Sequence, residues 1–227
     1  MSAHLPDDLS RIYDARFKAN RAYRTQIWEV LVADFFQQYI KTTDRVLDLG
    51  CGYGEFIGQV RCQAKWAMDL NPDSAQFLQP ETTLIQQDCS ARWPLEEGSL
   101  DIVFTSNFFE HLPDKHALGR TLDEIYRCLA PGGRLIAMGP NAKFLPGSYW
   151  DFWDHYVPLT EKSLEEALST RGFEMVRVED RFMPYSMVGK PRYPLFFLRL
   201  YLRLRLAWKF FGHQFLVIAQ KPSSPSS

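Results

Sequence analysis

Cysteine is scarce in this sequence of 227 residues, and its spacing is uninformative. The four cysteines form no C-x-x-C motif and no pattern typical of a disulfide framework, which argues against a structural zinc site and a disulfide-stapled secreted fold. No apolar run follows a basic region near residue 1, so we expect no signal peptide and a reduced, cytoplasmic compartment. The cysteines are Cys51, Cys62, Cys89 and Cys128.

Acidic residues are missing from the last part of the chain. Residues 181–227 contain eight Lys or Arg and no Asp or Glu, although the whole chain has a net charge of -1. The most apolar window, Pro194 to Phe211, is too short and too charged to span a bilayer. If residues 195–211 form one helix, one half of the helix surface carries cations mixed with leucines, and the other half could pack on a core. That other half consists of Phe196, Phe197, Leu200, Tyr201, Leu204, Ala207, Trp208 and Phe211.

This basic segment has three interpretations, which the sequence leaves open. It could be a lid over the site, a contact between two copies in a homodimer, or a peripheral contact with an anionic membrane surface. Nucleic acid is not an expected partner, because no nucleic-acid-binding module is present and the net charge is -1.

The rest of the composition is that of a globular domain. Hydrophobic residues make up 46% and charged residues 23%, which excludes a disordered chain, and 15% aromatics predict a ring-lined pocket or interface. We expect one domain over residues 1–221 and a disordered tail at 222–227. Its expected parts are a helical cap at 9–40, a core at 45–180 and a basic aromatic helical insertion at 182–212.

Short apolar runs alternate with helical patterns along the core. We predict strands at 45–49, 65–70, 83–87, 100–105, 134–138, 173–178 and 214–220. We predict helices at 54–62, 115–129 and 164–171. Continuous apolar strands separated by helices are typical of a doubly wound α/β fold with helices on both faces of a parallel sheet. No regular crossover helix joins the last two strands, so we expect an antiparallel pair to close the sheet.

A glycine-rich loop follows the first predicted strand directly. Gly50, Gly52 and Gly54 allow a sharp turn and a close approach of a ligand to the backbone. Asp69 ends the second predicted strand, where a carboxylate can accept hydrogen bonds from ribose hydroxyls. Glu55 stands where a dinucleotide fingerprint has its third glycine and would repel a pyrophosphate, and no G-x-x-x-x-G-K-[ST] motif is present. The loop therefore favours a nucleoside cofactor without phosphate over NAD or ATP.

Several ordered segments resemble the class I S-adenosylmethionine-dependent methyltransferases. They are VLDLGCGYGEF (46–56), AMDLNPD (67–73), QDC (87–89), LDIVFTSNFFEHLP (100–113) and PGGRLIAMGP (131–140). The resemblance covers about residues 45–180. It implies a Rossmann-like seven-stranded sheet, mostly parallel with an antiparallel last strand, and S-adenosylmethionine as cofactor with S-adenosylhomocysteine as product.

The resemblance also implies the residues that contact the cofactor. The glycine loop would line the methionine part, Asp69 would hold the ribose, Asp88 would meet the adenine edge, and Asn107 would lie beside the sulfonium. Asp88 as the cap of a turn and Asp48 as a brace of the loop are the alternatives. The whole implied set is Asp48, Gly50, Cys51, Gly52, Gly54, Asp69, Leu70, Asp88, Cys89, Asn107 and Phe108.

Two histidines are candidate catalytic bases. His155 lies in an aromatic segment (149–156) that commonly borders the acceptor pocket in this family; the alternative is a histidine that only fixes this segment. His111 follows Glu110 in a stretch similar to the E-x-x-E-H motif of the ubiquinone-pathway O-methyltransferases, whose carboxylates and histidine bind a divalent metal. Asn107 replaces the first acidic residue here, so we predict no metal site and expect Glu110 and His111 to brace the loop.

The sequence therefore predicts methyl transfer to a small-molecule or glycan acceptor. A hydroxyl is the expected nucleophile because a histidine base suits it, and the basic aromatic segment suggests a lipid-linked acceptor. One alternative is a protein that binds S-adenosylmethionine or S-adenosylhomocysteine without catalysis. An NAD-dependent oxidoreductase is a remote alternative, disfavoured by Glu55.

Overall fold

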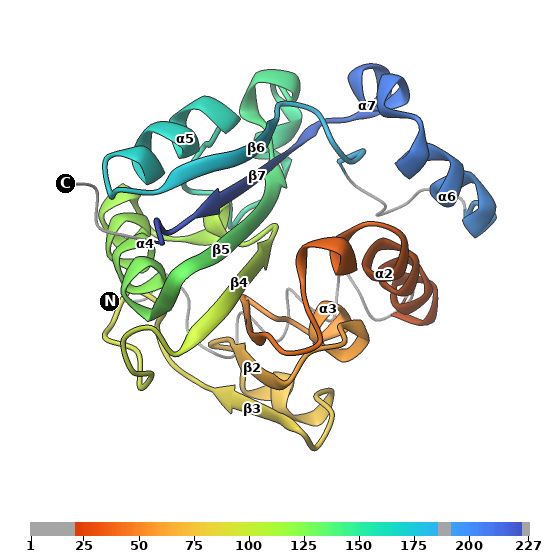
Figure 1. Cartoon of the computed structure of the whole chain (residues 1–227). Helices are drawn as coiled ribbons and strands as arrows, with labels where there is room; N and C mark the ends of the chain where they lie inside the picture. Colours follow the sequence, from red (N-terminus) through yellow and green to blue (C-terminus); the bar gives the residue numbers. More distant parts are fainter. Residues whose placement is uncertain (1–20, 186–191, 224–227) are drawn as a thin grey trace.

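A single sheet of seven strands forms the centre of the computed structural model, which describes residues 21–185 and 192–223 (Figure 1). The strands are β1 (Arg45–Leu49), β2 (Ala64–Met68), β3 (Thr82–Ile85), β4 (Leu100–Ser106), β5 (Leu129–Pro140), β6 (Glu174–Glu179) and β7 (Gln214–Gln220). Their order is β3-β2-β1-β4-β5-β7-β6. The first five strands pair in parallel, and β7 runs antiparallel between β5 and β6. The predicted fold class is confirmed, including the antiparallel last strand.

Helices cover both faces of this sheet (Figure 1). One face carries α4 (Lys115–Cys128) and α5 (Glu161–Ser169). The other carries α2 (Arg21–Asp34), α3 (Glu55–Gln59), α6 (Leu195–Arg203) and α7 (Arg205–Phe211). Short 3-10 turns connect these elements: η2 (Phe36–Tyr39), η3 (Pro72–Gln76), η4 (Phe109–His111), η5 (Ala142–Phe144) and η6 (Ser148–Asp151).

Two hydrophobic cores result, one on each face of the sheet. In β1, Leu47 and Leu49 join the core under α4 and α5, whereas Val46 joins the other core, because successive side chains of a strand point to opposite faces. The core under α2 and α3 is rich in rings, and Phe56 stacks on Phe104 with their centroids 3.6 Å apart. The sheet is thus buried on both sides, as the continuous apolar strands require.

Several element boundaries differ from the predicted ones. The helix after the glycine loop spans only Glu55–Gln59, and α5 begins earlier than predicted because Thr160 and Ser163 form a capping box at its start. The predicted cap at 9–40 is seen as α2 and η2, and residues 9–20 lie outside the described residues. Residues 224–227 of the predicted disordered tail also lie outside them.

The prediction of one helix over 195–211 is wrong. The helix breaks at Leu204 (φ -96°, ψ 81°), where α6 ends and α7 begins. The reason is Trp208, which is buried against Phe35 and Phe182 and whose Nε1 donates to the carbonyl of Tyr201 at 2.8 Å in the last turn of α6. The carbonyl of Tyr201 also accepts from the amide of Leu204 at 3.2 Å, so the indole helps to satisfy a carbonyl at the C-terminal end of α6.

The break also overturns the predicted faces of this segment. Of the side chains predicted to be able to pack on a core, Trp208 is buried, but five are exposed: Phe196, Phe197, Leu200, Leu204 and Phe211. Leu202, assigned to the mixed half, is buried instead. None of the helices in the described ranges has both the length and the hydropathy needed to cross a membrane.

Candidate active site

The glycine loop leaves the carboxyl end of β1 in a conformation that favours glycine. Gly50, Gly52 and Gly54 have φ values of +72°, +53° and +70°. The amide of Gly50 donates to the carbonyl of Met68 at 2.8 Å, which ties the loop to the end of β2. A Cβ on Gly50 would lie 2.3 Å from the ring of Phe108. The fold therefore brings Phe108, which follows β4, against the loop that follows β1.

Asp69 fixes the loop from the end of β2. Its Oδ2 accepts from the amide of Gly52 and its Oδ1 from the amide of Asn71, both at 2.8 Å. Burial raises the pKa of Asp69, while these hydrogen bonds act in the opposite direction. A carboxylate has about four acceptor sites, so Asp69 keeps lone pairs for ribose hydroxyls. Leu70 follows it and is half-buried.

The other two candidates around the loop are fully enclosed. Asp48, in β1, accepts from the amide of Ile57 in α3, a contact that braces the loop, and burial raises its pKa well above the usual range. Burial also raises the pKa of the Cys51 thiol strongly, so this thiol is neutral and unreactive near pH 7. Both residues act on the shape of the loop.

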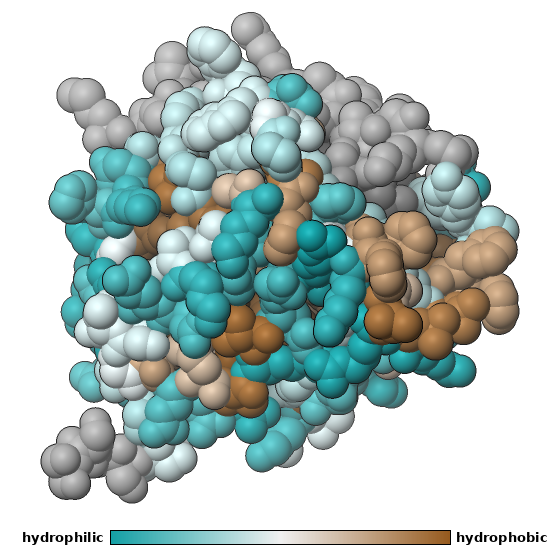
Figure 2. Space-filling model, turned by 90° about the horizontal axis from the view of Figure 1, so that it is seen from above, coloured by the Kyte–Doolittle hydropathy of each residue, from teal (hydrophilic) through white to brown (hydrophobic). Residues whose placement is uncertain are grey.

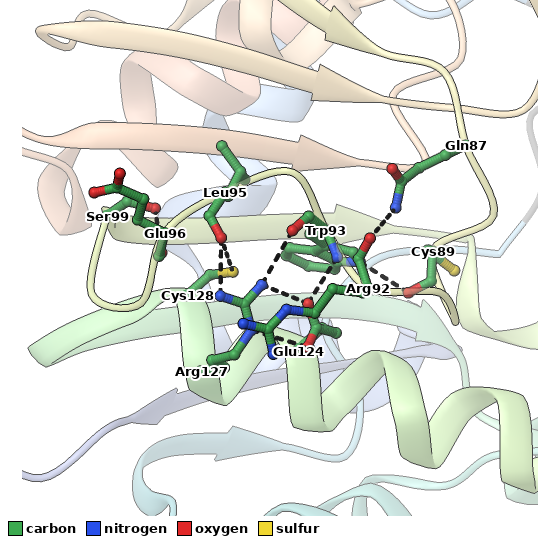
Figure 3. A network of polar contacts seen from close by, with 10 residues as sticks. All are labelled: Gln87, Cys89, Arg92, Trp93, Leu95, Glu96, Ser99, Glu124, Arg127 and Cys128. Carbon is green, nitrogen blue, oxygen red and sulfur yellow. Dashed lines mark hydrogen bonds and ion pairs between the residues drawn. The ribbon is translucent and has the colours of Figure 1, made fainter.

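Polar contacts hold the segment after β3, where the adenine edge is expected (Figure 3). The indole of Trp93 donates to the carbonyl of Cys89 at 2.8 Å, and the amide of Trp93 donates to Glu124 of α4 at 2.8 Å. Arg127 of α4 donates to the carbonyl of Leu95 at 2.8 Å. The segment is thereby attached to α4. Exposed Asp88 accepts from the amide of Ser90 at 2.8 Å, which is the contact of a turn cap.

Two residues after β4 lie at the same edge of the sheet. Asn107 has a φ of +50°, which strains a residue with a side chain, and its amide donates to the carbonyl of Met138 in β5 at 2.8 Å. The strained backbone at Asn107 aims the following residue, Phe108, at Gly50.

The two candidate histidines come together in one buried polar cluster. The rings of His111 and His155 lie 4.9 Å apart, edge to face. His111 Nδ1 lies 2.9 Å from the carbonyl oxygen and 3.2 Å from Oδ2 of Asp154, and its Nε2 lies 3.9 Å from Oε1 of Glu110. The carbonyl of Glu110 accepts from the amide of Tyr156 at 2.8 Å. Residues 43 positions apart in the chain thus form a single unit, which we call the histidine cluster: Glu110, His111, Asp154 and His155.

The charges in the histidine cluster depend on one another. Burial raises the pKa of Glu110 to about 7, and the charge of His111 opposes this. Burial disfavours the charged form of His111, but the hydrogen bond to Asp154 and the charges of Glu110 and Asp154 outweigh burial and raise its pKa. The charge of His111 opposes the rise in the pKa of Asp69. The amide of His111 donates to the carbonyl of Phe108 at 3.0 Å, and the ring of Phe108 lies against Gly50, so the cluster lies near the glycine loop. It can hold protons near neutral pH next to the glycine loop.

The histidine cluster is also compact in the way a metal site is. In the described part of the chain, Glu110, His111 and His155 are the set whose potential ligand atoms lie within 4.8 Å of one another. Asn107, which stands at the first acidic position of the E-x-x-E-H motif, is exposed and donates to the hydroxyl of Ser106 at 3.1 Å. In the structure, His155 thus lies with Glu110 and His111, the two motif residues, in the set of potential metal ligands.

The start of α2 lies beside the glycine loop. Arg24 forms an ion pair with Glu55 at 2.9 Å, and the guanidinium of Arg21 lies 4.1 Å from the ring centroid of Phe77 and 5.7 Å from that of Tyr53. Arg24 is therefore engaged with a carboxylate and Arg21 with two rings. Neither contact was evident in the sequence, because Arg21 and Arg24 precede the loop by some 30 residues without any motif.

The comparisons with known proteins agree with this arrangement. The sequence model of a family described as a methyltransferase domain matches residues 20–178, which is most of the chain. The chain belongs to this family. S-adenosylmethionine is accordingly the cofactor, as the resemblance of the sequence motifs implied.

The chain is similar to two curated methyltransferases whose names state the molecule that they methylate. It is 26% identical over 183 residues to a demethylmenaquinone methyltransferase of Symbiobacterium thermophilum (68% of this chain, 66% of the relative). It is 34% identical over 110 residues to the chloroplastic tocopherol O-methyltransferase of Arabidopsis thaliana (42% of this chain, 30% of the relative). The chain thus spans less than two thirds of the length of each.

A solved structure has the same fold. A SAM-dependent methyltransferase of Archaeoglobus fulgidus superposes with a TM-score of 0.66 at 21% identity, covering 89% of this chain and 97% of the other.

The residues at the loop suit S-adenosylmethionine chemically. The cofactor carries a positive sulfonium and ribose hydroxyls but no phosphate, and the loop offers backbone amides together with the carboxylate of Asp69. A pyrophosphate would instead meet Glu55 and Asp69 at the same loop. The donor set therefore fits the group that the family implies.

Proposed function

We propose that this chain transfers the methyl group of S-adenosylmethionine to a hydroxyl of a small-molecule or glycan acceptor, and that this acceptor is lipid-linked. The observation that carries the proposal is the histidine cluster beside the glycine loop. A hydroxyl must lose its proton as it attacks, and a histidine whose imidazole is oriented by a carboxylate is a side chain suited to accept it. The tocopherol O-methyltransferase similarity supports oxygen as the nucleophile.

In this proposal, some residues of the chain hold the cofactor and others accept the proton of the acceptor hydroxyl. When bound, S-adenosylmethionine supplies the methyl group at its positive sulfur. Asp69 and the amides of the glycine loop hold the ribose and methionine parts, and Phe108 excludes water from the space next to Gly50. The histidine cluster faces the acceptor hydroxyl. Correct alignment of two reacting groups in a dry site accounts for much of the rate gain in such displacements.

The first test is calorimetric titration with S-adenosylmethionine, S-adenosylhomocysteine and NAD. We expect the first two to bind and NAD not to bind. The same protein is then incubated with methyl-labelled S-adenosylmethionine and a panel of hydroxyl acceptors: hydroquinone and chromanol lipids, a lipid-linked glycan and soluble phenols. Label in a lipid hydroxyl supports the proposal. Binding of the cofactor without transfer to any hydroxyl would favour a non-catalytic binding protein.

The surface of α6 and α7 supports a lipid-linked acceptor. Hydrophobic side chains gather there beside hydrophilic ones, at the right edge of Figure 2. We call this the basic aromatic surface. Its exposed apolar members are Phe196, Phe197, Leu200, Leu204, Leu206, Phe210 and Phe211, and its exposed cations include Arg203, Arg205 and Lys209.

An anionic membrane matches both properties of the basic aromatic surface. Leu206 and Phe210 are 68% and 70% exposed, which is costly for a face in water. Each Lys or Arg near an anionic bilayer contributes roughly 1 kcal/mol of attraction. A homodimer formed by two copies of this surface would also bury the apolar side chains, but it would bring cations such as Arg203 and Lys209 of one copy close to those of the other. We therefore propose peripheral membrane contact as the role of this surface.

Changing Leu206 and Phe210 together to serine is expected to weaken binding to vesicles of anionic phospholipid by about 10-fold or more, because two inserted side chains are lost. Co-sedimentation at low and high salt measures it, and raised salt should weaken the wild type as well. Val176→Ser, which removes another exposed apolar side chain on β6, is the matched control. Wild-type protein that stays in the supernatant at low salt, or elutes as a dimer with its apolar surface protected, would contradict membrane contact.

A further inference from the structure

The hydrogen bonds of His111 define which of its nitrogens carries a proton. Both groups next to Nδ1, the carbonyl oxygen of Asp154 at 2.9 Å and its carboxylate oxygen at 3.2 Å, can only accept. A neutral imidazole has one N–H and one bare nitrogen. Nδ1 must therefore carry the hydrogen, which leaves the lone pair on Nε2.

Exposure separates the members of the histidine cluster. The side chain of His111 is 27% exposed, whereas those of Glu110 and Asp154 are 4% and 6% exposed. His155 is packed between Phe152, stacked at 5.0 Å, and Tyr149 at 4.8 Å. Among these groups, an acceptor molecule can reach His111 most easily.

We propose that His111 is the base that takes the proton of the acceptor hydroxyl at Nε2, and that Asp154 is a positioning residue that holds His111 Nδ1–H and orients the ring. This inference rests on the proposed function and assigns roles within it. Asp154 was not a candidate from the sequence, and His155 becomes part of the wall behind His111.

The acceptor hydroxyl, S-adenosylmethionine and His111 account for all atoms and charges in the proposed step. The acceptor oxygen gives its proton to His111 Nε2 and forms a bond to the methyl carbon. The carbon–sulfur bond breaks, its electron pair stays on sulfur, and the product is the neutral thioether. The imidazolium is stabilised by the carboxylate of Asp154 and then loses its proton to water.

Several titratable groups act on His111 from neighbouring elements. Asp154 and Glu110 favour its charged form, and Asp69 faces it from the end of β2. Tyr149 is neutral near pH 7, because burial strongly raises the pKa of its hydroxyl. The imidazole of His155 lies edge to face with His111. Of these neighbours, Asp154 alone accepts from His111 Nδ1 within 3.2 Å in the described contacts.

The first experiment needs no acceptor. Protein with ¹⁵N-labelled histidine is titrated in EDTA by long-range ¹H–¹⁵N NMR, with His111→Gln to assign the resonance. We expect the Nδ1–H tautomer in the neutral form. Asp154→Asn should lower the pKa of His111 by about one unit, because a neighbouring carboxylate shifts a pKa by about 1–3 units. Asp151→Asn, the same change at an exposed site three residues earlier, should leave it unchanged.

The spectrum can overturn the assignment in two ways. An Nε2–H tautomer in the wild type would mean that Nε2 is not the basic nitrogen. The titration is also repeated with one equivalent of zinc chloride and of magnesium chloride. If either ion binds stoichiometrically and stops His111 from titrating, the cluster is a metal site and the proton role is wrong.

The second experiment uses an acceptor found by the panel. His111→Gln should lower kcat about 100- to 10,000-fold with little change in S-adenosylmethionine affinity. Asp154→Asn should shift the acid limb of the kcat–pH profile to lower pH by about one unit and lower its plateau, which a purely structural role would not do. Transfer that persists in His111→Gln would refute this inference while leaving the proposed function intact. A correct tautomer without transfer in any variant would refute the function.

Discussion

Replacing Asp69 by alanine is expected to weaken binding of S-adenosylmethionine by about 100-fold or more. The carboxylate accepts from the amides of Gly52 and Asn71 at 2.8 Å each, and we propose that it also holds the ribose. Hydrogen bonds to a charged group contribute about 1.5–3 kcal/mol each, and about 2.7 kcal/mol corresponds to a 100-fold change in Kd. The loop would lose its anchor together with the ligand contact.

Calorimetric titration with S-adenosylhomocysteine measures this effect without turnover. Asp69→Asn keeps the shape and one acceptor oxygen, so its loss should be smaller. Glu81→Ala, which removes a carboxylate 58% exposed on the other side of η3, is the control and should bind like the wild type. A folded Asp69→Ala protein that binds within about threefold of the wild type would show that the cofactor does not depend on this carboxylate.

Gly50→Ala is expected to destabilise the protein by about 3 kcal/mol or more and to abolish cofactor binding. The residue has a φ of +72°, and its new Cβ would lie 2.3 Å from the ring and 2.8 Å from the Cβ of Phe108. Rotation of the ring cannot move that Cβ, so the backbone after β4 or the loop after β1 has to shift. For a chain of this size the loss corresponds to a drop in Tm of about 6–12 °C.

Two further variants separate the causes of this loss. Gly147 has a φ of +88° with nothing within 4 Å of an added Cβ, so Gly147→Ala measures conformational strain alone, about 1 kcal/mol. Adding Phe108→Ala to Gly50→Ala removes the ring overlap and should restore part of the stability. Equal losses of Tm in Gly50→Ala and Gly147→Ala would mean that Phe108 does not press on the loop.

Much of the fold could be predicted because its signals are local. Strand β1 ends where the apolar run meets Gly50, and β7 is an uninterrupted apolar run, so both were predicted with the bounds observed. The reversal of β7 followed from the missing crossover helix. The glycine loop, Asp69 and the absence of phosphate-binding motifs predicted a nucleoside cofactor without phosphate, and the resemblance of the ordered motifs identified it as S-adenosylmethionine.

The rest depends on contacts between distant residues. Nothing near Leu204 marks a helix end, since neither proline nor glycine is there. The break comes from Trp208, which packs between Phe35, just after α2, and Phe182, after β6. The pairing of His111 with Asp154 joins two loops, and an acidic residue beside His155 was its one trace in the sequence. Periodicity cannot reveal either contact.

The segment between β6 and β7 begins and ends at one place. The amide of Phe182 donates to the carbonyl of Gln214 at 2.6 Å, and the amide of His213 donates to the carbonyl of Met183 at 2.8 Å. Residues 184–212 thus connect two points of the chain that lie next to each other and are joined by hydrogen bonds. Such a closed excursion can be lengthened, shortened or exchanged between relatives without altering the register of the sheet. The sheet, with the glycine loop at the end of β1 and Asp69 at the end of β2, therefore does not depend on the length of this segment.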